Sequence, residues 1–105
     1  MGNKGKAETF IGFAVRANKY RTGLNTCGTL KRANLFLLCV TASENTCKEA
    51  QKLAKKYHCK LLKTTIEPLD NFTHKTNVKI MAITDKALAE AIINNSENDF
   101  IEIGL

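Results

Sequence analysis

The 105 residues are 44% hydrophobic and 25% charged, an ordinary balance for one globular domain that buries roughly two thirds of its unfolded surface. The longest strongly apolar run, residues 35–40, is too short to cross a bilayer, and the N-terminus lacks a signal peptide's apolar stretch, so we expect a cytoplasmic protein. Residues 1–66 carry 13 Lys and Arg against three acidic residues, a net +10, whereas residues 67–105 carry three against seven, a net −4. This asymmetry favours a polyanionic partner such as RNA, DNA or an acidic membrane face, although some lysines only make helices soluble.

The first third of the chain predicts a short basic leader and two helices. Residues 1–6 read as a flexible leader, and residues 8–19 as an amphipathic helix. The expected inward face of that helix comprises Phe10, Phe13, Ala14 and Ala17. Thr22 is a candidate N-cap for a second helix that runs to about Arg32. Residues 22–29 of this stretch are rich in Gly, Asn and Thr, which cost up to ~1 kcal/mol each in helix propensity, so a capping or functional reason is expected.

The middle of the chain predicts two strands around a long helix. Residues 34–41 form a continuously apolar strand, as expected in a sheet that is covered on both faces. The sequence Thr41-Ala42-Ser43-Glu44 fits a capping box that opens the next helix. That helix directs Cys47, Ala50, Ala54 and Tyr57 inward and Lys48, Lys52, Lys55 and Lys56 toward solvent. A second strand over residues 59–64 follows it directly.

The last third predicts a short helix at residues 67–71 and a buried strand at 78–84. Asp85 then caps a final helix to about Asn94, and residues 96–105 form an acidic tail in which 100–103 could add an edge strand. Strands alternate with helices, so the expected fold is a single α/β domain over residues 7–95. Its architecture is a three-layer α/β/α sandwich around a small mixed sheet.

Cysteine and histidine spacing argues against a metal centre, a cofactor or a disulfide framework. The chain contains no Cys-x-x-Cys pair, and its only histidines, His58 and His74, form no ligand-like pair. We expect reduced thiols that pack as small hydrophobic groups, at Cys27, Cys39, Cys47 and Cys59.

Several short motifs in a fixed order resemble the superfamily of small kink-turn RNA-binding proteins that includes the ribosomal proteins L-seven-Ae and L-thirty-e. The closest likeness is to the stand-alone bacterial members of the YlxQ type. The resemblance covers roughly residues 10–95. Its motifs are Gly12-Phe13-Ala14-x-Arg16-Ala17-x-Lys19, Thr22-Gly23, Ala42-Ser43-x-Asn45-Thr46, Leu69, and Ala82-Ile83-Thr84-Asp85.

This resemblance implies a non-catalytic RNA-binding protein that is ribosome-associated or binds structured RNA, a kink turn or ribosomal RNA. In the family, a Gly-x-Asn-Glu motif at the start of the second helix reads guanine edges, and a Lys one turn later holds phosphate. Apolar residues near the fourth helix cover a flipped-out nucleotide, and irregular RNA generally exposes such edges. The residues that the resemblance and the basic charge together assign to RNA are Arg16, Lys19, Arg21, Thr22, Gly23, Asn25, Thr26, Thr29, Lys31, Arg32 and Leu69.

The chain departs from the family pattern at contact positions. Thr26 stands where the family has Glu, and Thr29 where it has Lys, so one bidentate acceptor and one charge are missing. Asp70 and His74 stand at two family glycines, and a carboxylate that faced phosphates would oppose binding. These differences predict kink-turn recognition that is weakened, retuned or lost.

Four other interpretations remain open from the sequence. Thr22-Gly23 could be only a turn, with Gly28 packed closely against a neighbour. An enzyme would need a site such as Asp70 with His74 or His58 with Cys59, but no phosphate loop, paired carboxylates or nucleophile elbow accompanies them. The same fold could instead serve as a protein-interaction module that has lost its RNA specificity, or touch ribosomal RNA by charge alone.

Overall fold

The centre of the sheet is built from two fully apolar strands. The computed structural model describes residues 5–97 and 99–103. In it, β2 (Leu35–Leu38) pairs in parallel with β3 (Lys60–Thr64) and antiparallel with β4 (Ile80–Ile83). Every residue of β2 and β4 is buried, as expected for central strands with helices on both faces.

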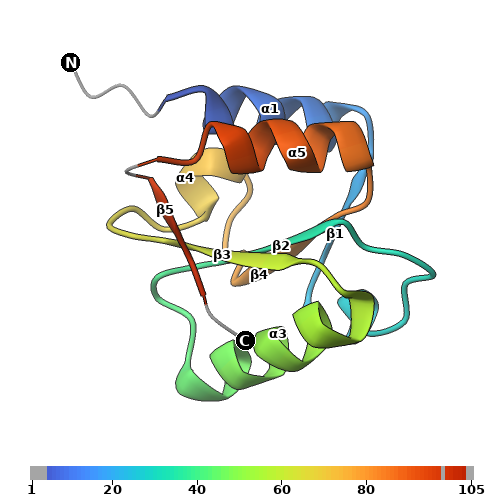
Figure 1. The fold of residues 1–105 in the computed structure, drawn as a ribbon. Coiled ribbons are helices and arrows are strands. Elements are labelled where there is room, and N and C mark those ends of the chain that lie inside the picture. The colour runs from blue at the N-terminus through green and yellow to red at the C-terminus, as the bar shows by residue number, and fades with distance from the viewer. Residues whose placement is uncertain (1–4, 98, 104–105) are drawn as a thin grey trace.

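Two short strands complete the sheet. β1 (Tyr20–Thr22) pairs antiparallel with β4, and β5 (Phe100–Glu102) pairs antiparallel with β3. The described residues therefore form one mixed sheet of five strands in the order β1-β4-β2-β3-β5 (Figure 1). The sequence pattern did not reveal β1, because three residues at a sheet edge, with an arginine at the centre, carry no hydrophobic alternation.

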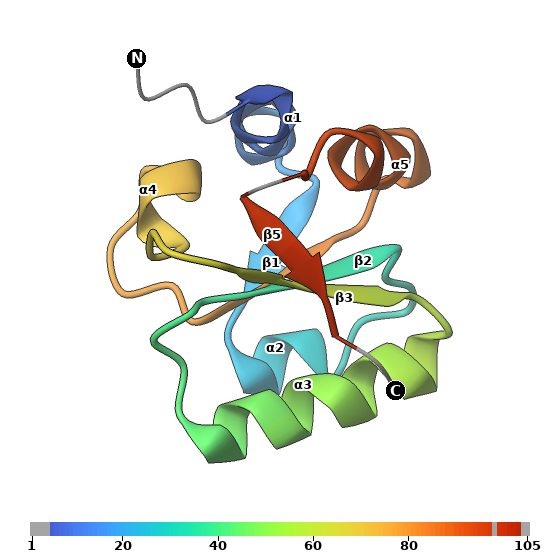
Figure 2. The same ribbon diagram turned by 60° about the vertical axis from the view of Figure 1, so that its left-hand side comes forward.

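Helices cover both faces of the sheet. One layer contains α1 (Gly5–Arg16), α4 (Asp70–Thr73) and α5 (Lys86–Asn94), and the other contains α2 (Leu24–Cys27) and α3 (Glu44–Tyr57) (Figure 2). The expected α/β class, with an α/β/α sandwich around a mixed sheet, is confirmed. The buried side chains accordingly divide into two clusters, one on each face of the sheet.

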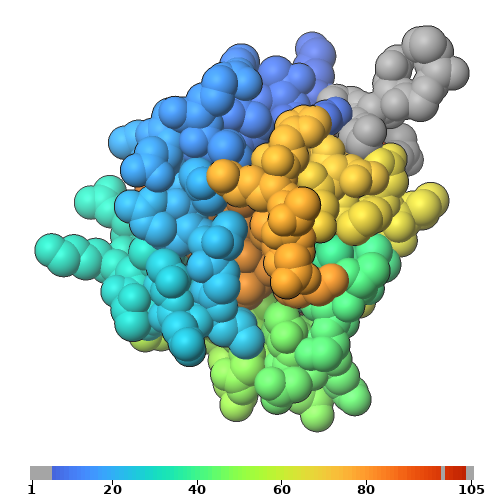
Figure 3. All heavy atoms as spheres, turned by 180° about the vertical axis from the view of Figure 1, so that it is seen from behind, coloured from blue at the N-terminus to red at the C-terminus, as the bar shows by residue number. Residues whose placement is uncertain are grey.

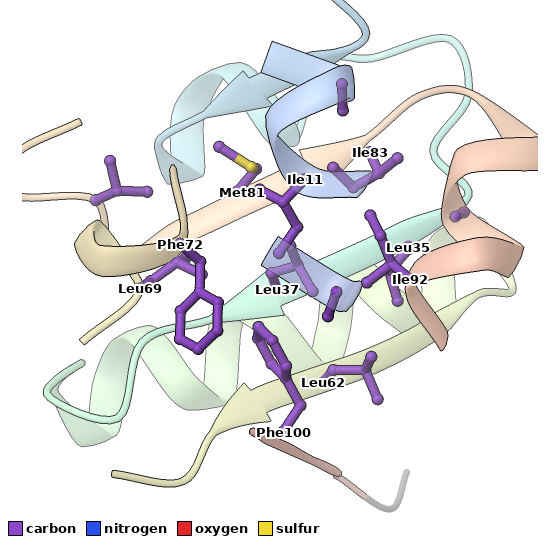
Figure 4. Packing of buried hydrophobic residues seen from close by; sticks show 14 of the residues in the cluster. Ile11, Leu35, Leu37, Leu62, Leu69, Phe72, Met81, Ile83, Ile92 and Phe100 are labelled. Carbon is purple, nitrogen blue, oxygen red and sulfur yellow. The ribbon is translucent and has the colours of Figure 1, made fainter. Parts of the chain in front are cut away.

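Successive side chains of β2 pack alternately into the two clusters. Leu35 and Leu37 join Ile11, Met81 and Ile92 below the first helix layer (Figure 4). Phe36 and Leu38 point the other way, toward α2 and α3, where they pack with the alanines of α3. This period of two follows from strand geometry and explains why the whole strand had to be apolar.

Two helix starts illustrate how capping sets the boundaries. Asp85 caps α5 as predicted, and its carboxylate accepts a hydrogen bond from the Leu88 backbone N–H at 2.9 Å. The cap of α3 is Ser43 rather than Thr41, because the Ser43 hydroxyl accepts from the Thr46 N–H at 3.1 Å. The predicted capping box is therefore wrong by two residues.

The buried face of α1 differs from the predicted one. Ala7, Ile11 and Ala14 are fully buried, whereas Phe13 is 44% exposed and Ala17 lies exposed beyond the end of the helix. Phe13 is rotated about 100° from Ala14 around the helix axis, which takes it away from the sheet. α1 begins at Gly5, so the end of the predicted leader is helical, and residues 1–4 lie outside the described part of the chain.

The second helix is much shorter than predicted. Thr22 is the last residue of β1 rather than a cap, and α2 ends at Cys27 instead of continuing to Arg32. Side chains of α3 compete for the carbonyl groups that a longer helix would have used. Lys56 Nζ donates to the Gly28 carbonyl at 2.9 Å, and the Tyr57 hydroxyl donates to the Leu30 carbonyl at 2.7 Å.

The C-terminal segment forms the outer strand of the sheet beside β3. β5 occupies three of the four residues that the sequence proposed for an edge strand, and Phe100 packs into the first cluster. Lys60 Nζ lies 3.1 Å from both carboxylate oxygens of Glu102. Residues 98, 104 and 105 of the acidic tail lie outside the described residues.

Candidate nucleic-acid interface

Two segments distant in sequence lie side by side along the β1 edge of the sheet. β1 pairs with β4, and the Gly23 N–H donates to the Ile80 carbonyl at 3.3 Å where the chain turns into α2. Lys75, in the segment that connects α4 to β4, lies over the ring of Tyr20 in β1. In Figure 3 the connection (orange) runs beside the β1 segment (light blue) on this face.

A groove of about 330 Å³ separates the start of α2 from this connection. Thr22, Gly23 and Leu24 line one side, and residues 76–80 together with Thr46 of α3 line the rest. Gly23 has φ 89° and ψ 142°, a backbone conformation that residues with a side chain rarely adopt. No atom lies within 4 Å of the position a Cβ would take, so open space lies next to this glycine.

Of the predicted site residues, Thr22 and Gly23 line this groove, and the polar residues that follow them in α2 do not. Asn25 and Thr26 are exposed on α2, and Thr26 also borders a smaller hollow with Asn18, Arg21 and Thr22. Thr29 is exposed but lies beyond the end of α2, and its hydroxyl donates to the Thr26 carbonyl at 3.0 Å. The structure thus brings Thr22, Gly23, Asn25 and Thr26 together, with Thr29 one turn away.

The basic residues of the predicted site are spread over the end of α1, β1 and the connection from α2 to β2. Arg16 is the last residue of α1, and its guanidinium lies 5.1 Å from the centroid of the Phe13 ring. Lys19 precedes β1 and is exposed, whereas Arg21 is half-buried in β1 and donates to the Asn18 carbonyl at 3.3 Å. The exposed residues Lys31 and Arg32 lie in the connection from α2 to β2.

The two segments that meet at this edge contain no carboxylate over long stretches. Residues 9–43 include five Lys and Arg and no acidic residue, and residues 71–84 include two lysines and no acidic residue. The second stretch supplies Lys75 and Lys79, both exposed. The charged side chains that these two stretches bring to the edge are therefore all positive, and like charges from separate segments add where the segments meet.

Asp70 lies next to this face, and its carboxylate accepts hydrogen bonds from the backbone of the α4–β4 connection. The backbone N–H groups of Asn77 and Val78 donate to the two oxygens of its carboxylate at 2.7 and 2.8 Å. The Val78 and Asn77 hydrogen bonds hold the pKa of this carboxyl below its usual value. The carboxylate therefore organises the connection between α4 and β4.

Leu69 does not contribute to an exposed surface. Its side chain is 0% exposed and packs in the first cluster, between α4 and the sheet. Its backbone N–H donates to Cys39 Sγ at 3.3 Å. The prediction that Leu69 covers a nucleotide is therefore wrong, because burial of an apolar side chain in the core leaves it no contact with a ligand.

Sequence reasoning missed the second wall of the groove. Thr46, Thr76, Asn77 and Lys79 line it, and Lys75 reaches β1, yet none of them was assigned to the site. Only the pairing of β1 with β4 shows that residues 74–79 lie next to α2. The acid-free stretch from residue 71 to residue 84 was the signal that could have pointed to them.

A second hollow, of about 530 Å³, lies between the end of α3, the start of β3 and α5. His58 and Cys59 line it together with Lys60, Lys86 and Glu90. Burial raises the pKa of the Cys59 thiol to about 11, so this thiol is protonated at neutral pH. A protonated thiol is a poor nucleophile, which argues against a Cys–His dyad here.

The side chains of Asp70 and His74 have different partners. The Asp70 carboxylate binds backbone N–H groups, and His74 Nε2 lies 3.1 Å from a carboxylate oxygen of Glu8 in α1. All four cysteines are free thiols, with Cys27 and Cys39 buried and the other two half-buried. Within residues 5–97 and 99–103, no group of three or more His, Cys, Asp or Glu side chains could hold a metal ion.

Comparisons with known proteins extend only to the fold. The sequence matches no family model and no curated protein. Among solved structures, the chain is similar to a protein of unknown function from Bacillus halodurans, with a TM-score of 0.72 and 17% sequence identity. The match covers 85% of this chain and 94% of the other. No helix in the described part of the chain has the length and apolar character needed to cross a membrane.

Proposed function

We propose that this protein is a non-catalytic, cytoplasmic RNA-binding protein of the kink-turn-binding ribosomal protein type. Its partner is a structured RNA, either a kink turn or a segment of ribosomal RNA, and it binds along the β1 edge of the sheet. The observation that carries the proposal is the meeting of two acid-free basic segments around one groove at this edge.

Geometry and charge support a nucleic acid over other polyanions. The groove has an open glycine and is lined by the short polar side chains of Thr22, Thr46, Thr76 and Asn77, a combination that admits a backbone and offers hydrogen bonds to base edges. Lysines on the opposite wall can neutralise phosphates. A membrane surface would instead favour a broad basic face with exposed apolar side chains.

Fluorescence-anisotropy titration with a kink-turn RNA and with a matched duplex that lacks the sheared G·A pairs tests this proposal. We expect binding that weakens steeply between 50 and 200 mM salt, because neutralised phosphates release counterions. A preference for the kink turn would identify a specific reader. Equal binding to both RNAs would identify a protein that recognises RNA mainly by charge.

Two matched double variants locate the interface. Lys19→Glu with Lys75→Glu reverses two charges at the β1 edge, and Lys48→Glu with Lys55→Glu reverses two exposed charges on α3. The first pair is expected to abolish most binding and the second to weaken it only slightly. Equal losses would show that the β1 edge is not the interface. The absence of RNA binding by the unmodified protein would favour a protein-interaction module on the same fold.

A further inference from the structure

Asp70 closes the segment that forms one wall of the groove. It is the first residue of α4, and it reaches forward over eight residues to bind the N–H groups of Asn77 and Val78. Both oxygens of the carboxylate are used, one for each N–H. The Asp70 carboxylate thereby joins the start of α4 to residues 77 and 78 and closes the loop between them.

The loop needs this contact because its backbone is unusual. His74 and Asn77 have φ values of 59° and 61°, in the left-handed region that residues with a side chain seldom occupy. Each such residue costs roughly 1–2 kcal/mol, so a loop with two of them persists only where other contacts hold it. The hydrogen bonds from Asn77 and Val78 are charge-assisted and stronger than those to a neutral acceptor.

The loop in turn places groups that face the groove. Thr76 and Asn77 line it directly, and Lys75 is carried to the ring of Tyr20. Lys79, just beyond the loop, donates from Nζ to the Thr41 hydroxyl at 2.7 Å. Without Asp70 these groups would have to be ordered by the ligand, at the expense of binding affinity.

We propose that Asp70 is a positioning residue for RNA recognition, whose carboxylate fixes residues 74–79 as the second wall of the groove. This inference rests on the proposed function. It reverses the simple electrostatic expectation, because a carboxylate near phosphates would be expected to weaken binding. Asp70 strengthens binding through the geometry that it imposes on the loop.

The substitution Asp70→Asn separates the two effects by the sign of the change. The amide keeps the shape of the side chain and one acceptor oxygen. Its NH₂ group is a donor, however, so it cannot accept a hydrogen bond from the second backbone N–H. If charge alone mattered, the variant would bind RNA more tightly. If Asp70 positions the loop, we expect about tenfold weaker RNA binding, because the variant loses one charge-assisted hydrogen bond and the order of the loop.

Glu44→Gln supplies the matched control, because it removes the same charge from an exposed position in the first turn of α3. This control is expected to leave RNA binding unchanged or slightly tighter. Amide hydrogen exchange of Asn77 and Val78, measured by NMR in the RNA-free proteins, reports the loop directly. Exchange at both amides should accelerate in Asp70→Asn and remain unchanged in Glu44→Gln.

The results distinguish failure of the proposed RNA-binding function from failure of the role proposed for Asp70. Failure of the unmodified protein to bind kink-turn RNA or the duplex would overturn the proposed function and, with it, this inference. Binding by the unmodified protein together with equal or tighter binding by Asp70→Asn would overturn the inference alone. Unchanged exchange at Asn77 and Val78 in Asp70→Asn would also overturn it, because the carboxylate would then not hold the loop.

Discussion

Lys75 Nζ lies 5.5 Å from the centroid of the Tyr20 ring, which joins the loop after α4 to the edge strand β1. An ammonium group at this distance from an aromatic face is attracted by the electrons of the ring, and at a surface the contact contributes about 0.5–1 kcal/mol. The contact places a positive charge midway along the proposed interface. It also connects two parts of the chain that are 55 residues apart in sequence.

We expect Lys75→Met to weaken RNA binding and to reduce the slope of log affinity against log salt by about one. The methionine keeps the apolar stem of the side chain but removes the charge that would neutralise a phosphate. Anisotropy titrations at four or more salt concentrations measure the slope. Lys52→Met on α3 is the control, and a slope that is unchanged in Lys75→Met would remove this residue from the interface.

Gly23→Ala is expected to destabilise the fold by about 1–3 kcal/mol, because φ 89° is strained for any residue that has a Cβ. Open space surrounds the position, so the cost arises from the backbone and not from a clash. Urea unfolding measures it. Gly12→Ala, in the middle of α1, should instead leave stability equal or higher, since alanine has the better helix propensity.

Leu69→Ala should lower the free energy of unfolding by about 2–5 kcal/mol, as expected when a fully buried leucine is truncated. Ile66→Ala is a suitable comparison because this side chain is 83% exposed, and we expect a change within about 0.5 kcal/mol. Equal effects of the two substitutions on urea unfolding would contradict the placement of Leu69 in the core.

Asp70 is expected to stabilise the folded protein at neutral pH and to lose this effect in acid. The hydrogen bonds from Val78 and Asn77 lower its folded-state pKa below the unfolded value of about 3.9. A depressed pKa stabilises the folded state above the unfolded pKa, and the contribution disappears as the pH falls through the folded value.

The difference in unfolding free energy between the unmodified protein and Asp70→Asn should therefore be constant above about pH 5 and shrink below it. Urea titrations between pH 7 and pH 2 measure this difference. A difference that stays constant down to pH 2 would show that the carboxylate gains nothing from its two hydrogen bonds in the folded protein.

The thiol of Cys59 should react slowly with iodoacetamide at neutral pH. The rate of this reaction should continue to increase up to about pH 11. Burial raises its pKa to about 11, and only the thiolate reacts. Peptide mapping by mass spectrometry follows each cysteine separately. In urea the rate for the same residue should be half-maximal near pH 8.5, since an ordinary thiol has a pKa of about 8.5. A half-maximal rate near pH 8.5 in the folded protein would contradict the environment described for this residue.

The acidic residues 97, 99 and 102 show how charge and fold are related in this chain. They are three of the seven acidic residues in residues 67–105, and two of them lie at or next to β5. β5 and β1 are the opposite edges of the sheet. The acidic end of the sequence thus lies at the sheet edge opposite β1, where Glu102 pairs with Lys60.

Strong local signals determined much of this protein. The apolar run at Leu35–Cys39 required a strand buried on both faces, and the alternation of strands and helices indicated the α/β/α sandwich. Asp85 marked the start of α5 because an N-cap acts within one turn of the chain. Patterns of this kind depend on neighbouring residues, so they are readable without any knowledge of tertiary contacts.

Only the tertiary structure decided the candidate site. Tyr20, Arg21 and Thr22 form a strand because β4 offers them hydrogen-bonding partners, and α2 ends at Cys27 because side chains of α3 bind the carbonyls that follow it. Leu69, expected at the surface, is buried, and Phe13, expected in the core, is exposed. Both differences arise because burial depends on which face of a helix meets the sheet. The residues of the second wall of the groove are about 50 positions further along the sequence than those of the first. A local sequence pattern cannot show that two such distant segments meet. Long-range pairing of β1 with β4 brings the two walls together and concentrates the basic charge that each part of the sequence contains.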